Sequence, residues 1–191
     1  MNTNTNRTAR SNDPAAAIKK AKGFMIFGLK SWIKALEMSE GNKKSEGKFR
    51  YEVSEDASSG RIVRTADGSE VEGTARTRDQ WAAVGRPARL ASIGLRARKE
   101  ELENQLKERV EYTFDVTTGD ARLTRNGELV ADEPTTIADW AVKGQAVEKS
   151  LFLQLNVAIE WGIQIAADTT RDRMIKYGVI RKPVVPATKT A

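Results

Sequence analysis

One stretch of nine residues occurs twice in this chain, and it constrains the fold more than any other feature. The segment TRDQWAAVG covers residues 77–85, and TIADWAVKG covers residues 136–144. A shift of 59 residues superimposes Trp81 on Trp140 and gives seven identities across the 21 positions 65–85. We interpret this similarity as an internal duplication. The alternative is that two similar hairpin-to-helix junctions share the same turn and cap residues.

Each copy is predicted to join a small β-meander to a helix. FRYEV at 49–53 alternates apolar and charged residues, which is typical of a half-buried strand. VEYTFDV at 110–116 alternates in the same way, and a tight turn follows at 126–127, where the sequence is Asn-Gly. Thr77 and Thr136 then supply N-caps for the helices. We therefore expect an α+β fold with two β-meander-plus-helix units.

A tryptophan and a glycine recur at the start of each predicted helix. Trp81 and Trp140 would pack back on their own hairpins, because each lies in the first turn after an N-cap. Gly85 and Gly144 would let another backbone approach closely, since glycine has no side chain. The alternative is that the two WAxxG segments line a ligand pocket.

Two prolines mark the expected starts of helices. Asp13 and Pro14 are a favourable N-cap and first-turn pair, and apolar residues recur at helical spacing over 14–39. Pro87 would begin a fresh helix after a kink at 85–86, because proline lacks the N–H that a helix interior needs. That helix is expected to continue to about residue 108.

The last helices are expected over about 137–178. Within them the portion 146–167 is apolar on more than one face. It contains the longest apolar-rich run of the chain, SLFLQLNVAIEWGIQIAA at 150–167. Its polar residues would be costly at the centre of a bilayer, so we interpret it as a long, buried, apolar C-terminal helix. Such a helix lies at the centre of a fold or at an interface with a second subunit, and the small size of this chain favours the interface.

The expected organisation is one folded domain with two tails. Residues 1–13 would form a flexible N-terminal arm and residues 179–191 an extended C-terminal tail. The single α+β domain between them would cover residues 14–178, with pseudo-repeat units at 48–108 and 109–178.

The chain contains no cysteine and no histidine. The missing cysteine excludes disulfides and thiolate chemistry. The missing histidine removes the commonest general base and the commonest ligand of transition metals. We therefore expect a non-catalytic protein with no cofactor and no bound metal.

Charges are segregated along the chain. Residues 76–99 carry seven cations and one acid, whereas residues 100–138 carry four cations and ten acids. Residues 1–48 carry ten cations and four acids. Arginine dominates the block at 76–99, and its guanidinium group can contact a phosphate or a carboxylate through two parallel hydrogen bonds.

The leading hypothesis is a nucleic-acid-binding protein whose Arg-rich helical segment contacts the phosphate backbone of DNA or RNA. The expected site combines the seven cations of the 76–99 block with five lysines nearer the N-terminus. These residues are Arg76, Arg78, Arg86, Arg89, Arg96, Arg98, Lys99, Lys19, Lys20, Lys22, Lys43 and Lys44. Two alternatives stay open: the cations pair with the acidic block of the same chain, or with the acidic block of a neighbouring subunit.

A second hypothesis belongs to another class of protein. The chain would be a structural or assembly subunit, for instance of a viral particle, that forms a homo-oligomer through its C-terminal helix and tails. A third hypothesis is an adaptor or inhibitor that binds another protein. No secretory signal and no membrane span are predicted, so the expected location is the cytoplasm, or the virion for a structural subunit.

Overall fold

The computed structural model describes residues 14–39 and 47–182. These residues form four helices and two three-stranded antiparallel sheets, which confirms the expected α+β class. The elements in chain order are α1 Pro14–Ser39, β1 Phe49–Val53, β2 Ser59–Arg64, β3 Arg76–Thr77, α2 Arg78–Leu106, β4 Val110–Asp115, β5 Asp120–Arg125, β6 Glu128–Leu129, α3 Ile137–Glu160 and α4 Gln164–Tyr177. The predicted N-terminal arm at 1–13 lies outside the described residues.

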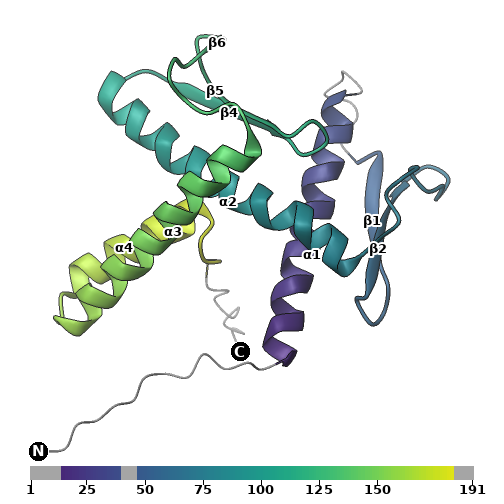
Figure 1. Ribbon diagram of the computed structural model, residues 1–191. Helices are drawn as coiled ribbons and strands as arrows, with labels where there is room; N and C mark the ends of the chain where they lie inside the picture. The colour runs from purple at the N-terminus through teal and green to yellow at the C-terminus, as the bar shows by residue number, and fades with distance from the viewer. Residues whose placement is uncertain (1–13, 40–46, 183–191) are drawn as a thin grey trace, which may run out of the picture.

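Helix α2 connects the two halves of the structure (Figure 1). Its first half crosses α1 beside the sheet β1-β2-β3, and its second half crosses α3 beside the sheet β4-β5-β6. Helices α3 and α4 pack against each other and extend away from both sheets. One long helix, α2, is therefore shared by the two halves.

The two sheets have the same topology and matching registers. Strand β1 pairs with β2 so that Tyr51 lies opposite Ile62, and β4 pairs with β5 so that Tyr112 lies opposite Leu123. The predicted strand at 49–53 has the bounds of β1, and the prediction at 110–116 is one residue longer than β4. The tight turn before β6 has positive φ at Asn126 and Gly127, as an Asn-Gly hairpin turn requires.

The joint from sheet to helix forms as the repeated nine residues predict. Thr77 caps α2 by accepting a hydrogen bond from the N–H of Gln80, whose side chain accepts one from the N–H of Thr77. Thr136 caps α3 by accepting from the N–H of Asp139. The indole of Trp81 is fully buried and donates to the carbonyl oxygen of Gly60 on β2 at 2.8 Å. The first tryptophan therefore packs back on its own hairpin.

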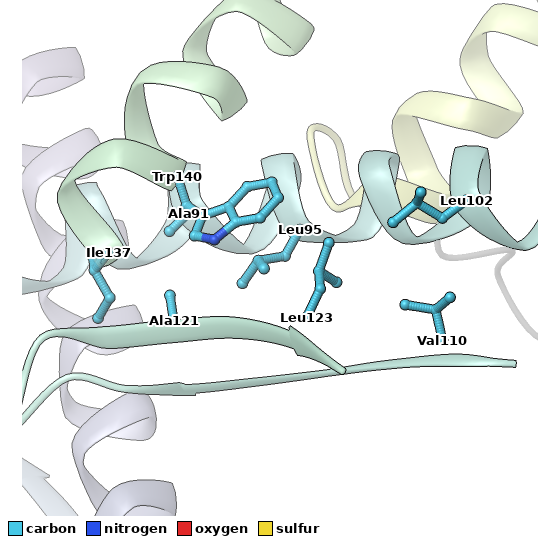
Figure 2. Packing of buried hydrophobic residues seen from close by; sticks show 8 residues of the cluster. All are labelled: Ala91, Leu95, Leu102, Val110, Ala121, Leu123, Ile137 and Trp140. Carbon is cyan, nitrogen blue, oxygen red and sulfur yellow. The ribbon is translucent and has the colours of Figure 1, made fainter. Parts of the chain in front are cut away.

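The second tryptophan fills the space between its sheet and the helices. Figure 2 shows Trp140 of α3 and Leu95 of α2 turned toward Ala121 and Leu123 of β5. Trp140 is fully buried, and its indole N–H donates to the carbonyl oxygen of Pro134 at 2.8 Å. Burial of side chains this large supplies much of the stability of a small core.

Glycine pairs lie at both helix crossings. A Cβ added to Gly85 would lie 1.9 Å from the carbonyl oxygen of Phe24 in α1, and one added to Gly144 would lie 1.8 Å from that of Leu90 in α2. The facing glycines are Gly28 and Gly94, at which an added Cβ would also approach backbone atoms within 3 Å. The expected close approach is confirmed. The internal duplication stays a prediction. If it holds, each repeat unit also includes the helix that precedes its sheet, because both crossings pair that helix with the helix that follows the sheet.

Pro87 does not begin a new helix, because α2 is continuous from Arg78 to Leu106. The missing N–H of Pro87 leaves one carbonyl, that of Ala83, without its helical partner, and Ala83 is exposed to water that can replace the bond. Residues on both sides of Pro87 are buried. Gly85 packs against α1, and Ala91 packs against the sheet β4-β5-β6. Packing on both sides thus offsets the local cost of proline.

The predicted long, buried C-terminal helix is wrong. Helix α3 ends at Glu160, the chain turns through Gly162 at a φ of 68°, and α4 begins at Gln164. The segment 150–167 is therefore a helical hairpin, and most of its apolar residues are exposed. The turn depends on Gly162, because a left-handed residue is readily supplied by glycine.

The end of the described chain is anchored to the helices. Gly178 ends α4 in the left-handed conformation, at the expected end of the last helices. Val179 is buried and Ile180 is partly buried in a cluster with Ile93 and Met174. Residues 183–191 of the predicted tail lie outside the described residues.

Candidate interaction surfaces

Most of the cations predicted to contact nucleic acid lie along one helix. Arg76 is on β3, and the other six cations of the 76–99 block are on α2. The partners that each side chain already has within the fold decide whether it is available to a polyanion.

Arg76 is engaged by aromatic rings. Its guanidinium carbon lies 4.4 Å from the ring centre of Trp32 and 5.1 Å from that of Trp81, and its Nε donates to the carbonyl oxygen of Gly73. This cation–π arrangement holds β3 against α1 and the start of α2. Arg78 pairs with its neighbour Asp79 at 3.3 Å.

Arg89 and Arg96 connect α2 to other parts of the fold. One guanidinium nitrogen of Arg89 lies 2.9 Å from Glu148 of α3 and 2.9 Å from the carbonyl oxygen of Val179. Arg96 donates through Nε to the hydroxyl oxygen of Tyr112 on β4 at 3.2 Å. Both side chains are only partly exposed, so they act chiefly within the molecule.

Arg98 and Lys99 pair with the acidic block of the same chain. Arg98 contacts Glu101 at 2.8 Å and Glu133 at 2.6 Å, and the side chain of Glu133 is only 5% exposed. These carboxylates, Glu101 first, raise the pKa of Arg98. Lys99 bonds to Glu103 and lowers the pKa of that carboxyl, which also accepts from the N–H of a β4 residue. The alternative of pairing within the chain therefore holds for these two cations.

An ion pair also joins α2 to α4. Lys176 lies 2.8 Å from Glu100. The ammonium of Lys176 lowers the pKa of Glu100, and the carboxylate in turn raises the pKa of Lys176. The pair helps to position the hairpin α3–α4 against α2.

Few of the predicted nucleic-acid contacts are left on open surface. Within residues 14–39 and 47–182, Arg86 is exposed and has no ion-pair partner. Lys19, Lys20 and Lys22 are exposed on α1, which has no acid in its first turn. The last two candidates, Lys43 and Lys44, lie outside the described residues.

A large exposed apolar surface lies on the hairpin α3–α4. Seven large hydrophobic residues between positions 152 and 165 are exposed, and we call them the hairpin surface. They are Phe152 (43%), Leu153 (65%), Val157 (43%), Ile159 (55%), Trp161 (75%), Ile163 (49%) and Ile165 (81%). Exposed apolar residues gathered in this way mark contact surfaces in soluble proteins.

A groove runs beside this surface, between α2 and the hairpin. Its volume is about 940 Å³. Its lining is mixed: Ala97, Ala146, Val147 and Leu151 are apolar, and Arg98, Glu101, Lys143 and Arg173 are charged. These side chains do not form a catalytic set. In the described part of the chain, no group of three or more acidic residues could hold a metal ion.

Sequence reasoning favoured a subunit interface for this apolar run, but it missed the hairpin and the exposure of these side chains within one chain. The charge pattern agrees with an interface, because residues 150–167 contain a single acid and no cation, a depletion typical of interface centres. The glycine at 162 was the signal for the hairpin, because it divides the helix.

Comparison with models of known protein families, with curated proteins and with solved structures finds no match. Among the helices of residues 14–39 and 47–182, none is long and apolar enough to cross a membrane. The basic residues and the hairpin surface are therefore the features from which a function can be inferred.

Proposed function

We propose that this protein is an assembly subunit that binds further copies of itself through the hairpin surface. The observation that carries the proposal is the exposure of seven large hydrophobic side chains within fourteen consecutive residues, 152–165. Leaving such side chains in water forgoes about 1.5–3 kcal/mol for each one that could be fully buried. A stable partner that covers them recovers part of this free energy.

The hairpin is suited to protein contact for two further reasons. It extends away from both sheets, so a partner can reach it without displacing another element (Figure 1). Its inner side is already packed through Leu151, Ala158, Ala167 and Thr170, so the hairpin is ordered before a partner arrives. A preformed surface saves the entropy that a disordered segment would lose on binding.

Replacing Leu153 with aspartate is expected to weaken self-association about thirtyfold, because a charge would be buried at the centre of the contact. The measurement is light-scattering mass across a micromolar concentration series. The wild-type chain should exceed its monomer mass of 21.1 kDa, and the variant should approach it.

The matched control is Leu129→Asp on β6. Leu129 is 55% exposed but lies outside the hairpin surface, so this variant should associate like the wild type. A wild-type chain that stays at 21.1 kDa throughout the series would refute the proposal.

Binding to the backbone of DNA or RNA is a second candidate, favoured by the exposed lysines of α1. Lys19, Lys20 and Lys22 lie within one turn, and no acid precedes Glu37 on this helix. Together with Arg86 they offer about four phosphate contacts, which predicts a loss of affinity on the order of 100-fold between 50 and 200 mM salt.

Fluorescence anisotropy with a random oligonucleotide tests this second candidate. Replacing Lys19, Lys20 and Lys22 with alanine should reduce the affinity and flatten its dependence on salt. Arg98→Ala is the control, because the guanidinium of Arg98 already pairs with Glu101 and Glu133. Equal losses in the two variants, or no binding by the wild type at 50 mM salt, would exclude the site on α1.

A further inference from the structure

We infer that two copies of this chain pair through α3 in antiparallel orientation, about a two-fold axis that passes between Leu151 and Phe152. The inference rests on the proposed self-association and names its partner and register. The seam that it uses includes two residues of the hairpin surface, Leu153 and Val157. It is drawn from the spacing of exposed residues on α3, their sizes and their charges.

One face of α3 has the spacing of a coiled-coil seam and is uncovered. Six residues follow one another at alternating intervals of three and four, which are the a and d positions of a heptad repeat. They are Lys143, Ala146, Ser150, Leu153, Val157 and Glu160, and all six are exposed. The residues that α3 buries in its own chain, such as Gly144, Leu151 and Ala158, lie on another side of the helix. The seam is therefore exposed, and its first half, Lys143, Ala146 and Ser150, lines the groove between α2 and the hairpin. A second copy would enter this groove along α3.

The seam is self-complementary in size when it is reversed. Ala146 and Val157 are equally far from the midpoint between Leu151 and Phe152. In an antiparallel pair about that midpoint, Ala146 of one copy therefore faces Val157 of the other, and Ser150 faces Leu153 in the same way. Each layer thus combines one small and one larger side chain, which keeps the two helices evenly spaced. A two-fold contact requires this reciprocity between positions i and j.

The seam is also complementary in charge. In the same register, Lys143 of one copy faces Glu160 of the other, so the symmetric pair gains two intermolecular ion pairs at its ends. Glu160 has no ion-pair partner within residues 14–39 and 47–182. Lys143 contacts Glu133 at 3.1 Å with 46% of its side chain exposed, and an ammonium has three donors. The ammonium of Lys143 can therefore donate to Glu133 of its own chain and to Glu160 of the other copy. Glu133 is also paired with Arg98. A parallel pair would instead place Lys143 against Lys143 and Glu160 against Glu160.

Site-directed cysteines test the register directly, because the natural chain contains none. In the inferred pair, the double variant Ala146→Cys/Val157→Cys brings position 146 of one copy beside position 157 of the other, and mild oxidation should link most of the dimer covalently. The single variants should not link, since identical positions would then lie about 16 Å apart along the helix. Within one chain the two cysteines are equally far apart and cannot bridge.

A charge reversal gives a second readout in the same assay. Glu160→Lys would face Lys143 of the other copy and should raise the dissociation constant at least tenfold. Asp172→Lys is the matched control, because it makes the same change of charge at an exposed position of α4, outside the seam.

The outcomes separate this inference from the proposed function. Self-association by light scattering without a covalent dimer of the double variant overturns the antiparallel register but leaves the assembly subunit standing. Efficient linking of the single variants shows a parallel pair and likewise overturns the register. A monomeric wild-type chain overturns both.

Discussion

Replacing Gly144 with alanine is expected to lower the free energy of unfolding by about 3 kcal/mol or more. The added methyl group would lie 1.8 Å from the carbonyl oxygen of Leu90 and 3.0 Å from the backbone nitrogen of Gly94. Both obstacles belong to the backbone of α2, so no side chain can rotate away. The crossing of α2 and α3 must open, and the core around Trp140 opens with it.

Gly23 supplies the control for this experiment. It lies inside α1, where an added Cβ meets no other atom within 4 Å. Gly23→Ala should therefore raise the free energy of unfolding by about 0.5–1 kcal/mol, because alanine is the better helix former. Gly85→Ala should instead behave like Gly144→Ala, since its Cβ would lie 1.9 Å from the carbonyl oxygen of Phe24.

Urea denaturation compares these glycine variants, at protein concentrations below those at which the wild type associates. The close crossing predicts opposite signs for Gly144→Ala and Gly23→Ala. The same change in unfolding free energy for both variants would contradict the backbone contact between α2 and α3.

Truncating Trp81 to alanine is expected to cost about 3–5 kcal/mol of unfolding free energy. The indole is fully buried, packs edge-on against Trp32 with ring centres 5.6 Å apart, and bonds to the carbonyl oxygen of Gly60. Its removal leaves a cavity at the joint of α1, α2 and sheet β1-β2-β3. It also leaves a buried carbonyl without its donor.

Two other tryptophan variants calibrate that result. Trp81→Phe keeps much of the buried volume but removes the indole N–H, so its cost should be smaller than that of alanine. Trp161→Ala should change the stability of the monomer by less than about 0.5 kcal/mol, because Trp161 is 75% exposed. Chemical denaturation at low protein concentration is required, since bound partner subunits raise the apparent stability. Equal losses for Trp81 and Trp161 would contradict the described joint.

The basic segment shows where reasoning from sequence stopped. The excess of cations at 76–99 can be counted from the sequence. Two kinds of partner were possible for them, a polyanion or the acidic block at 100–138. Only the folded chain brings Glu133 to Arg98 and Glu148 to Arg89, across 35 and 59 residues of sequence. A count of charges contains no information on such distances, so nucleic-acid binding by this segment stays a prediction.

By itself the sequence determined the local structure: the strand β1, the turn at 126–127, and the helix starts at Thr77 and Thr136. Each of these depends on residues within a few positions of one another, through alternation, turn conformation and capping hydrogen bonds. Tertiary structure alone decided the continuity of α2 through Pro87 and the exposure of the hairpin surface. Both depend on which distant segments cover a helix. Burial of α2 against its neighbours offsets the cost of Pro87 within the helix. No described segment covers the hairpin surface, so its apolar side chains stay in water.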